Sequence, residues 1–450
     1  MKSKTIYFVA GEVSADNHAA ALMHSLREFD TDFTLIGRGG PQMRAVAGEQ
    51  FKNWIASAAV LGLWEVIRKY GYFRGQFRET LKEIEESEPD AVVLIDYPGF
   101  NLRLARALRK QSAQAKIIYY ISPQVWAWNR GRIKKMARFL DLVLCIFPFE
   151  ADLYNKSSLR AVFVGHPMIE RLQVRKIDTE RDPNLIGLFP GSRLREVRKI
   201  FPVMIKTTHL LLKAKPTLHF QVAAASAELA HEMSEMLTLH LSPLPSPKGE
   251  ETFQAASNES MRMPPVSSPK REQSEPEPLV GFSAREDMGA TPLPSSRAEG
   301  RVRGGASQDR HLIEIKVGET AALMQRALAG IVASGSATLE AAYFRLPFVL
   351  IYKVAWPTCL AARLVVNVKY LGMPNVLADK EVVPEFIQHL AKPEAIAKAT
   401  WQLLEDTHAR DRMVSQFDTI VGKLGEDGAS EKAARAIVEE IGRSRMKPVN

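Results

Sequence analysis

Asp96 is the residue whose position best suits it to do chemistry. It directly follows a short apolar run at 91–95, and Pro98 and Gly99 fix the loop beyond it. A run without polar side chains predicts a fully buried strand of a parallel sheet. Ligands of such sheets bind beyond the carboxyl ends of the strands. Asp96 is therefore our candidate general base, although a loop aspartate that caps a helix would show the same pattern.

A second candidate site lies in the block 188–193, which reads Leu-Phe-Pro-Gly-Ser-Arg. An apolar strand runs there into a glycine turn and the start of a helix, so backbone N–H groups, the helix dipole and a guanidinium converge on one anion. We predict that Gly191, Ser192 and Arg193 bind a diphosphate. The block lacks the glycine spacing of a dinucleotide fold and the ending of a P-loop, which argues against hydride transfer and ATP hydrolysis.

The block 333–340 repeats the pattern of strand, turn and helix. Its acidic residue lies one to two helical turns in, where the carboxylate of nucleotide folds accepts the ribose hydroxyls. Either block alone would also suit an ordinary turn, but two such turns in one domain are much less frequent by chance. The predicted phosphate and ribose ligands are Ser334, Gly335, Ser336, Thr338 and Glu340.

The turn after the first apolar run is a weaker candidate. Gly11 allows a tight turn, and Ser14 or Asp16 can cap the helix that follows. An ordinary strand-to-helix turn explains the same residues equally well.

The elements that must position these residues form two series of short apolar runs alternating with amphipathic stretches. This alternation predicts an α/β protein with two Rossmann-like domains, each built on a parallel sheet, and a cleft between them. We place the domains at 1–174 and 185–392, followed by a helical segment at 393–446 that is rich in Ala, Leu, Glu and Arg. The runs lie at 5–10, 33–37, 91–95, 116–121 and 142–146, and then at 185–189, 218–222, 313–315, 330–333 and 347–351.

One stretch does not fit this alternation. The range 242–309 holds ten prolines and eleven serines but no isoleucine, and it predicts a disordered insertion within the second domain. Without it the net charge of +9 becomes +11, because the insertion carries 8 basic and 10 acidic residues. The basic character of the folded part suggests an anionic partner.

The composition excludes several classes of protein. With 450 residues and 46% apolar side chains the chain can build two cores, so global disorder is excluded. Cys145 and Cys359 are the two cysteines, too few for a disulfide framework or a cysteine metal site. The histidines are scattered, so we predict no metal ligands. We also predict no cofactor. No apolar run approaches a membrane span, and no signal peptide is expected, which favours a cytoplasmic location.

Two surface segments could meet a lipid. The range 58–78 mixes large apolar and basic side chains, as interfacial segments do, although a buried helix with one solvated face is the alternative. The range 130–138 has five basic residues in nine, which suits acidic headgroups, phosphates, RNA or simply a solvated helix face. The predicted acyl entrance in the first segment consists of Val60, Leu61, Leu63, Trp64 and Ile67.

Eight blocks together resemble the lipid-A-disaccharide synthase family, whose members are GT-B-fold glycosyltransferases of bacterial outer-membrane biogenesis. The resemblance covers nearly the whole chain except the insertion. One departure is Ala15, which stands where the family usually has glycine. The blocks lie at 10–14, 95–101, 122–128, 147–150, 165–167, 189–193, 333–340 and 374–375.

The resemblance implies attack by the 6-hydroxyl of 2,3-diacylglucosamine 1-phosphate on C1 of UDP-2,3-diacylglucosamine. The products are a β-1,6 disaccharide 1-phosphate, formed with inversion, and UDP, and the family requires no metal. By position, Asp96 becomes the base, Arg193 the catalytic partner at the diphosphate, and Asn375 part of the donor pocket. The resemblance makes 1–174 the acceptor- and lipid-binding domain and 185–392 the UDP-sugar-binding domain. Three residues of the first domain, Glu12, Ser14 and Asn101, are counted among the substrate-binding residues.

The resemblance also implies a peripheral protein on the cytoplasmic face of the inner membrane, and a homodimer with exchanged C-terminal segments. It leaves another GT-B enzyme as the alternative, either a UDP-GlcNAc transferase with a different lipid acceptor or a UDP-GlcNAc 2-epimerase. A non-enzymatic RNA- or membrane-binding protein is a further alternative, but it leaves both nucleotide-type turns unexplained. We therefore expect no nucleic-acid partner.

Overall fold

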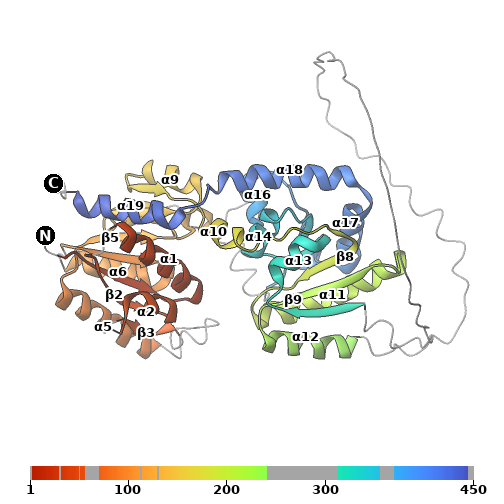
Figure 1. Ribbon diagram of the computed structural model, residues 1–450, viewed down its shortest axis with the longest axis horizontal. Helices are drawn as coiled ribbons and strands as arrows, with labels where there is room; N and C mark the ends of the chain where they lie inside the picture. Colours follow the sequence, from red (N-terminus) through yellow and green to blue (C-terminus); the bar gives the residue numbers. More distant parts are fainter. Residues whose placement is uncertain are drawn as a thin grey trace, which may run out of the picture. The chain divides into compact units, whose positions relative to one another are not determined.

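The computed structural model describes residues 3–29, 32–49, 51–55, 70–111, 114–128, 131–240, 312–354 and 369–443. They form two parallel sheets with helices packed against them (Figure 1), which confirms the predicted fold class. The predicted acyl entrance at 60–67 and the predicted insertion at 242–309 lie outside the described residues.

The first sheet has seven strands in the order β3-β2-β1-β4-β5-β6-β7, all parallel. The strand order changes direction between β1 and β4, and the two loops that leave these strands therefore share one edge. The strands are β1 (Thr5–Ala10), β2 (Thr34–Gly39), β3 (Lys52–Asn53), β4 (Ala91–Ile95), β5 (Lys116–Tyr120), β6 (Leu142–Cys145) and β7 (Ala161–Phe163). The helices are α1 (Val13–Phe29), α2 (Pro41–Ala47), α5 (Tyr70–Ser87), α6 (Pro98–Lys110), α7 (Val125–Trp128), α8 (Arg132–Met136), α9 (Pro148–Asn155) and α10 (Met168–Gln173).

The second sheet has six parallel strands in the order β10-β9-β8-β11-β12-β13. The strand order of this sheet changes direction between β8 and β11. It begins at Asp182, three residues before the predicted boundary at 185. Its strands are β8 (Asp182–Phe189), β9 (His219–Ala224), β10 (Ile313–Val317), β11 (Ala327–Ala333), β12 (Phe348–Tyr352) and β13 (Glu385–Ile387). Its helices are α11 (Leu194–Ala214), α12 (Ala227–His240), α13 (Thr320–Arg326), α14 (Ala337–Tyr343) and α16 (Met373–Ala378), with a short 3₁₀ helix at Gln388–Leu390.

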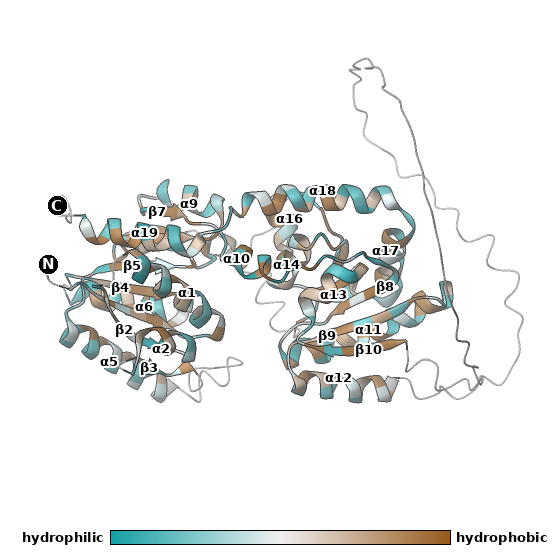
Figure 2. Cartoon of the chain, viewed as in Figure 1, coloured by the Kyte–Doolittle hydropathy of each residue, from teal (hydrophilic) through white to brown (hydrophobic). Residues whose placement is uncertain are grey.

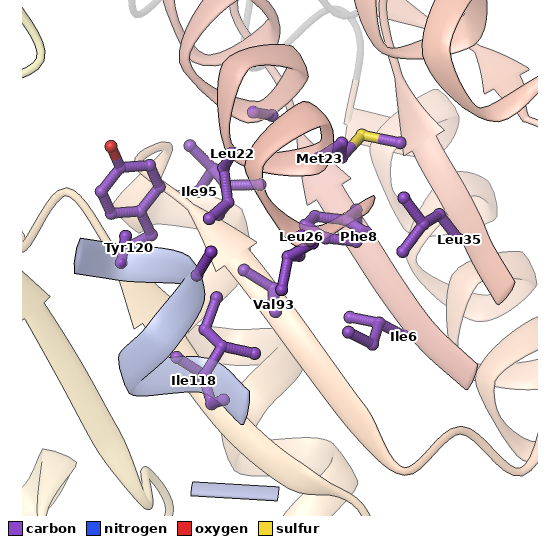
Figure 3. Packing of buried hydrophobic residues seen from close by; sticks show 14 of the residues in the cluster. Ile6, Phe8, Leu22, Met23, Leu26, Leu35, Val93, Ile95, Ile118 and Tyr120 are labelled. Atoms are coloured by element: carbon purple, nitrogen blue, oxygen red, sulfur yellow. The ribbon is translucent and has the colours of Figure 1, made fainter. Parts of the chain in front are cut away.

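The first sheet has a hydrophobic core on each face because its strands are apolar on both sides. Ile6, Phe8 and Val93 point toward α1, where Leu22 and Leu26 meet them (Figure 3). The alternate strand residues, such as Tyr7, Val92 and Leu94, belong to the other core, with Leu104 of α6. This double burial explains why the strands read as continuous apolar runs rather than alternating ones. Hydrophilic residues gather on outward helix faces, as α12 and α18 (Thr407–Lys423) show in Figure 2.

The helical C-terminal segment divides between the two sheets. α17 (Pro393–Glu405) packs on α11, and α18 packs on α14. α19 (Ala429–Gly442) instead packs on α1 and β5, and it contributes Ala433, Ala434 and Ile437 to the first core.

The point of insertion decides whether residues 242–309 disturb the second sheet. The chain leaves α12 at His240 and resumes as β10 at Ile313, and β10 pairs in register with β9 over its whole length. The predicted insertion therefore falls between a helix and an edge strand, where added chain length costs little free energy. No helix of the described ranges combines the length and hydrophobicity that a membrane crossing requires.

Candidate functional site

Asp96 follows the last residue of β4 in a strained turn. Asp96 and Tyr97 both have left-handed backbone, with φ of 46° and 50°. Two such residues in succession cost about 1–3 kcal/mol each and must be held by their surroundings. The Asp96 N–H donates to Tyr120 O at 3.0 Å, and the Asp96 carbonyl accepts from the Tyr119 hydroxyl and from Asn101 Nδ2. These hydrogen bonds hold the strained turn and thereby keep the carboxylate at the edge of the sheet.

Gly11, at the end of the neighbouring strand β1, fits this turn. A Cβ on Gly11 would lie 2.4 Å from the Tyr97 ring, so only glycine lets the two loops approach each other. Glu12 follows and is exposed. The structure thus brings the Glu12 and Asp96 loops together at the point where the strand order of the first sheet changes direction.

The electrostatic surroundings of Asp96 suit a base. Burial, and after it the negative charge of Glu12, raise the pKa of Asp96 to about 6 against the opposing effect of a hydrogen bond from the Tyr97 backbone. A carboxylate with this pKa is ionised at neutral pH, and it accepts a proton more readily than an ordinary aspartate.

We expect kcat/KM to fall as the pH drops through about 6, because protonated Asp96 cannot accept a proton. Glu12→Gln removes the second cause of the raised pKa, so the acidic limb should move to lower pH while burial keeps it above the ordinary value. A pH–rate profile with Glu86→Gln, an exposed helix residue, as the control would check this. An acidic limb that Glu12→Gln leaves in place would contradict the coupling.

A cavity of about 280 Å³ lies beside Asp96. It is formed at the carboxyl ends of β4, β5 and β6, where Ile121 also has left-handed backbone with φ of 62°. Its lining residues are Asp96, Pro98, Ile121, Ser122, Pro123, Gln124, Ile146 and Phe147.

Glu150 supports the wall of this cavity, and our sequence analysis did not identify it as a site residue. It is fully buried at the start of α9. Its carboxylate accepts from Trp126 Nε1 at 2.9 Å and from the Phe147 N–H at 3.3 Å. Burial raises the pKa of Glu150 to about 7. The bond from the Phe147 N–H to Glu150 is one half of a capping box, but Phe147 lacks the hydroxyl or carboxylate that forms the other half, so the sequence carries no capping signal that could have revealed this role.

Asn101, which we predict to bind substrate, is buried beside the Asp96 turn. It is 0% exposed, and Nδ2 donates to Ile95 O at 3.1 Å and to Asp96 O at 2.8 Å. Asn101 therefore positions the Asp96 turn.

The two predicted caps of α1 lie apart in the structure. Ser14 is exposed and lines a separate cavity of about 690 Å³, together with His18 and Arg171. Asp16 does not cap α1. Its buried carboxylate accepts from the N–H groups of Gly40, Gln42 and Met43 at 2.9–3.0 Å, and thereby caps α2.

The predicted diphosphate turn lies at the end of β8. Gly191 has φ of 110°, and a Cβ there would lie 3.0 Å from Glu196 Oε2 and 3.8 Å from the Cβ of Ala333. Because Ala333 ends β11, the second contact shows that the two predicted anion turns adjoin. Ser192 is exposed, and Arg193 stands at the N-cap of the 21-residue helix α11.

Arg193 is free to move toward a ligand. Its side chain is 69% exposed and pairs with Glu196 Oε1 at 3.1 Å. Exposed pairs of this kind contribute about 0–1 kcal/mol, so exchanging the carboxylate for a diphosphate costs little.

The second turn has exposed and buried members. Gly335 and Ser336 are exposed and Ser334 is half-buried, and Gly335 has φ of 147°. Thr338 is fully buried, and its hydroxyl donates to Gly335 O at 2.7 Å. In this structure the hydroxyl of Thr338 therefore stabilises the turn. Glu340 is partly accessible, and its Oε1 accepts from Arg171 Nη2 at 2.6 Å.

Asn375, which we predict to line the donor pocket, is also buried. It is 0% exposed, and Oδ1 accepts from the N–H groups of Val382 and Val383 at 2.7 and 2.9 Å. Nδ2 donates to Val383 O and to Glu385 Oε1, both at 2.8 Å. Asn375 thus locks the chain between α16 and β13.

Asn375→Ala is expected to lower the free energy of unfolding by about 2–4 kcal/mol, because it leaves buried backbone groups at Val382 and Val383 unpaired. Denaturant unfolding would measure the change, with exposed Ser336→Ala as the comparison. Unchanged stability together with a lost affinity for the donor would show that Asn375 contacts the donor directly.

In the described part of the chain, no group of three or more His, Cys, Asp or Glu side chains gathers as metal ligands would.

Comparison with known proteins gives consistent results. A family model described as lipid-A-disaccharide synthetase matches residues 6–253 and 300–439. The lipid-A-disaccharide synthase of Persephonella marina is 30% identical over 97% of this chain and 99% of its own length. That of Trichlorobacter lovleyi is 30% identical over 98% of this chain and 99% of its own length.

Solved structures share the fold at low identity. The UDP-GlcNAc 2-epimerase of Neisseria meningitidis, bound to UDP-GlcNAc, has a TM-score of 0.54 and 11% identity, covering 98% of this chain and 100% of its own. A putative UDP-N-acetylglucosamine 2-epimerase of Listeria monocytogenes has a TM-score of 0.54 and 10% identity, covering 99% of this chain and 98% of its own.

Proposed function

The chain belongs to the lipid-A-disaccharide synthase family, and we propose that it joins UDP-2,3-diacylglucosamine to 2,3-diacylglucosamine 1-phosphate. The products are the β-1,6-linked disaccharide 1-phosphate and UDP. The observation that carries the proposal is the carboxylate of Asp96. It lies beside a cavity, its pKa is about 6, and its backbone is held in a strained left-handed turn.

In the proposed reaction, Asp96 takes the proton from the 6-hydroxyl of the acceptor as that oxygen bonds to C1 of the donor. The bond between C1 and the diphosphate oxygen breaks with inversion, and UDP leaves with the electron pair. Gly191 and Ser192 bind the diphosphate through the N–H groups that lead into α11, and Arg193 neutralises the charge that develops on it. In this proposal Arg193 and the start of α11 do the work that a metal does elsewhere.

The exposed hydroxyl of Ser336 and the backbone of Ser334 and Gly335 contact phosphate, and Glu340 accepts the ribose hydroxyls. Arg171 pairs with Glu340 Oε1, and in this proposal Oε2 accepts from the ribose.

Glu340→Ala is expected to raise the KM for the donor substrate about tenfold or more, since it removes the hydrogen bonds from the ribose hydroxyls to a charged carboxylate. The KM for the acceptor substrate should stay the same. Arg171→Ala is the matched control, because it breaks the ion pair and keeps the carboxylate. Equal effects of both variants in steady-state kinetics would mean that Glu340 serves only the ion pair.

Three features of the family extend this proposal to the protein's surroundings. The protein contacts the cytoplasmic leaflet of the inner membrane peripherally, with the acyl chains entering near residues 60–67. It forms a homodimer in which α19 of one copy packs on α1 of the other, using the contacts that α19 makes within this chain. Light scattering tests the dimer, and a monomeric mass at micromolar concentration would refute it.

The alternative is turnover of UDP-GlcNAc alone. In a coupled assay for UDP, we expect release from UDP-2,3-diacylglucosamine only when the diacylglucosamine 1-phosphate acceptor is present. Conversion of UDP-GlcNAc to its 2-epimer would contradict the synthase function.

A further inference from the structure

A basic groove of about 490 Å³ lies between α6 and α8 on the first sheet. The sequence already indicates its α8 side as a cluster of basic residues, but α6 supplies the other side. Its lining residues are Pro98, Gly99, Leu102, Arg103, Arg106, Arg109, Lys110, Arg132, Lys135, Met136, Arg138 and Phe139.

The walls of the basic groove carry cations and no acids. On α6, Arg103, Arg106 and Lys110 follow one another at spacings of three and four residues, which places them on one helix face. Lys135 and Arg138 stand on the other wall. All five are exposed, and none forms an ion pair within the described residues. Arg109, which also lines the groove, pairs with Asp141 at 2.6 Å, so the uncompensated positive charge of the walls comes from the other five side chains.

The floor of the basic groove is apolar. Met136 is 1% exposed, and Leu102 and Phe139 are partly buried against the same core. Arginine and lysine stems lie well along such surfaces while their charged heads reach outward. An anionic head on an apolar chain complements this combination better than a free phosphate or a nucleic acid does.

The basic groove adjoins the cavity beside Asp96. Pro98 lines both, and it stands two residues after Asp96 at the start of α6. Arg103 lies nearest to this shared end along the helix. A molecule seated in the groove near Pro98 can therefore present a hydroxyl to Asp96.

We propose that the basic groove binds the acceptor, with its cations on the 1-phosphate and its floor against an acyl chain. The proposal rests on the proposed function and names the half of the site that distinguishes acceptor from donor. Arg103 and Arg106 bind the phosphate at the end nearest Asp96, and the chain extends along α6.

The test combines two variants with two acceptors in a neutral detergent. Arg103→Glu/Arg106→Glu is expected to raise the KM for the phosphorylated acceptor at least tenfold while the donor KM stays the same. With the acceptor that lacks the 1-phosphate, the wild type and the variant should have the same KM, because the interaction partner is gone. Lys213→Glu, an exposed cation on α11, controls for net charge. The neutral pair Arg103→Gln/Arg106→Gln should show the same pattern more weakly.

The outcomes separate the two proposals. If the wild type makes disaccharide and the variants keep its acceptor KM, the groove proposal is wrong and the function stands. If the variants instead lose only their binding to vesicles of anionic phospholipid, the groove docks membrane lipid and the proposal is overturned. If the wild type makes no disaccharide, both proposals fall.

Discussion

Asp96→Asn is expected to lower kcat at neutral pH by at least about 10²-fold, because the amide cannot accept the proton of the attacking hydroxyl. UDP binding should stay unchanged, since the predicted diphosphate ligands lie on the second sheet. Steady-state kinetics in detergent, combined with calorimetry of UDP binding, would measure both. Asp152→Asn, an exposed carboxylate of α9, is the matched control and should keep full activity.

Asp96→Asn is expected to raise the stability of the fold at neutral pH although it lowers the activity. The folded pKa of Asp96, about 6, lies above its usual 3.8, so the folded state disfavours the charged form. The stability that this group contributes is present below about pH 4 and is lost as the pH rises through about 6. Asp96→Asn, which cannot ionise, should therefore unfold at a higher temperature than the wild type at pH 7 but not at pH 4. A lower unfolding temperature at pH 7 together with lost activity would indicate a structural role instead.

Arg193→Ala is expected to lower kcat by about 10²–10³-fold, the usual cost of removing one donor that stabilises developing charge. Its side chain holds only a weak surface pair with Glu196, so the fold should not change. Arg193→Lys should recover part of the rate, because the charge remains while the bidentate geometry is lost.

Arg198→Ala is the control for this experiment. Arg198 lies further along α11 and pairs with Glu232 at the surface, so its loss should leave kcat unchanged. A raised donor KM with a normal kcat in Arg193→Ala would show that Arg193 binds ground state and transition state equally, and would contradict its catalytic role.

The sequence could predict the features that follow from local pattern. The apolar runs predict β4 and β8, and the residues that follow each run predict which side chains stand at the carboxyl edge. The predictions for Asp96, Gly191 and Ser336 were made in this way. Their exposure or strain is consistent with the patterns that revealed them.

Contacts between distant segments could not be predicted in the same way. Asp16 caps α2 across 24 residues of chain, and no local pattern distinguishes that bond from a cap of its own helix. Asn101 and Asn375 are predicted ligands because amides bind sugars, and the sequence does not show that both also hydrogen-bond to backbone groups of buried turns. Most side-chain hydrogen bonds go to backbone or water, and a sequence does not show which backbone groups they satisfy.

The central claim is tested most directly by product analysis. The wild-type protein would be incubated with UDP-2,3-diacylglucosamine and 2,3-diacylglucosamine 1-phosphate in detergent containing EDTA, and the products identified by mass spectrometry and by NMR of the new anomeric carbon. We predict equal amounts of UDP and a β-1,6-linked disaccharide 1-phosphate. An α-linked product, a requirement for added metal, or no disaccharide while UDP still binds would contradict the account.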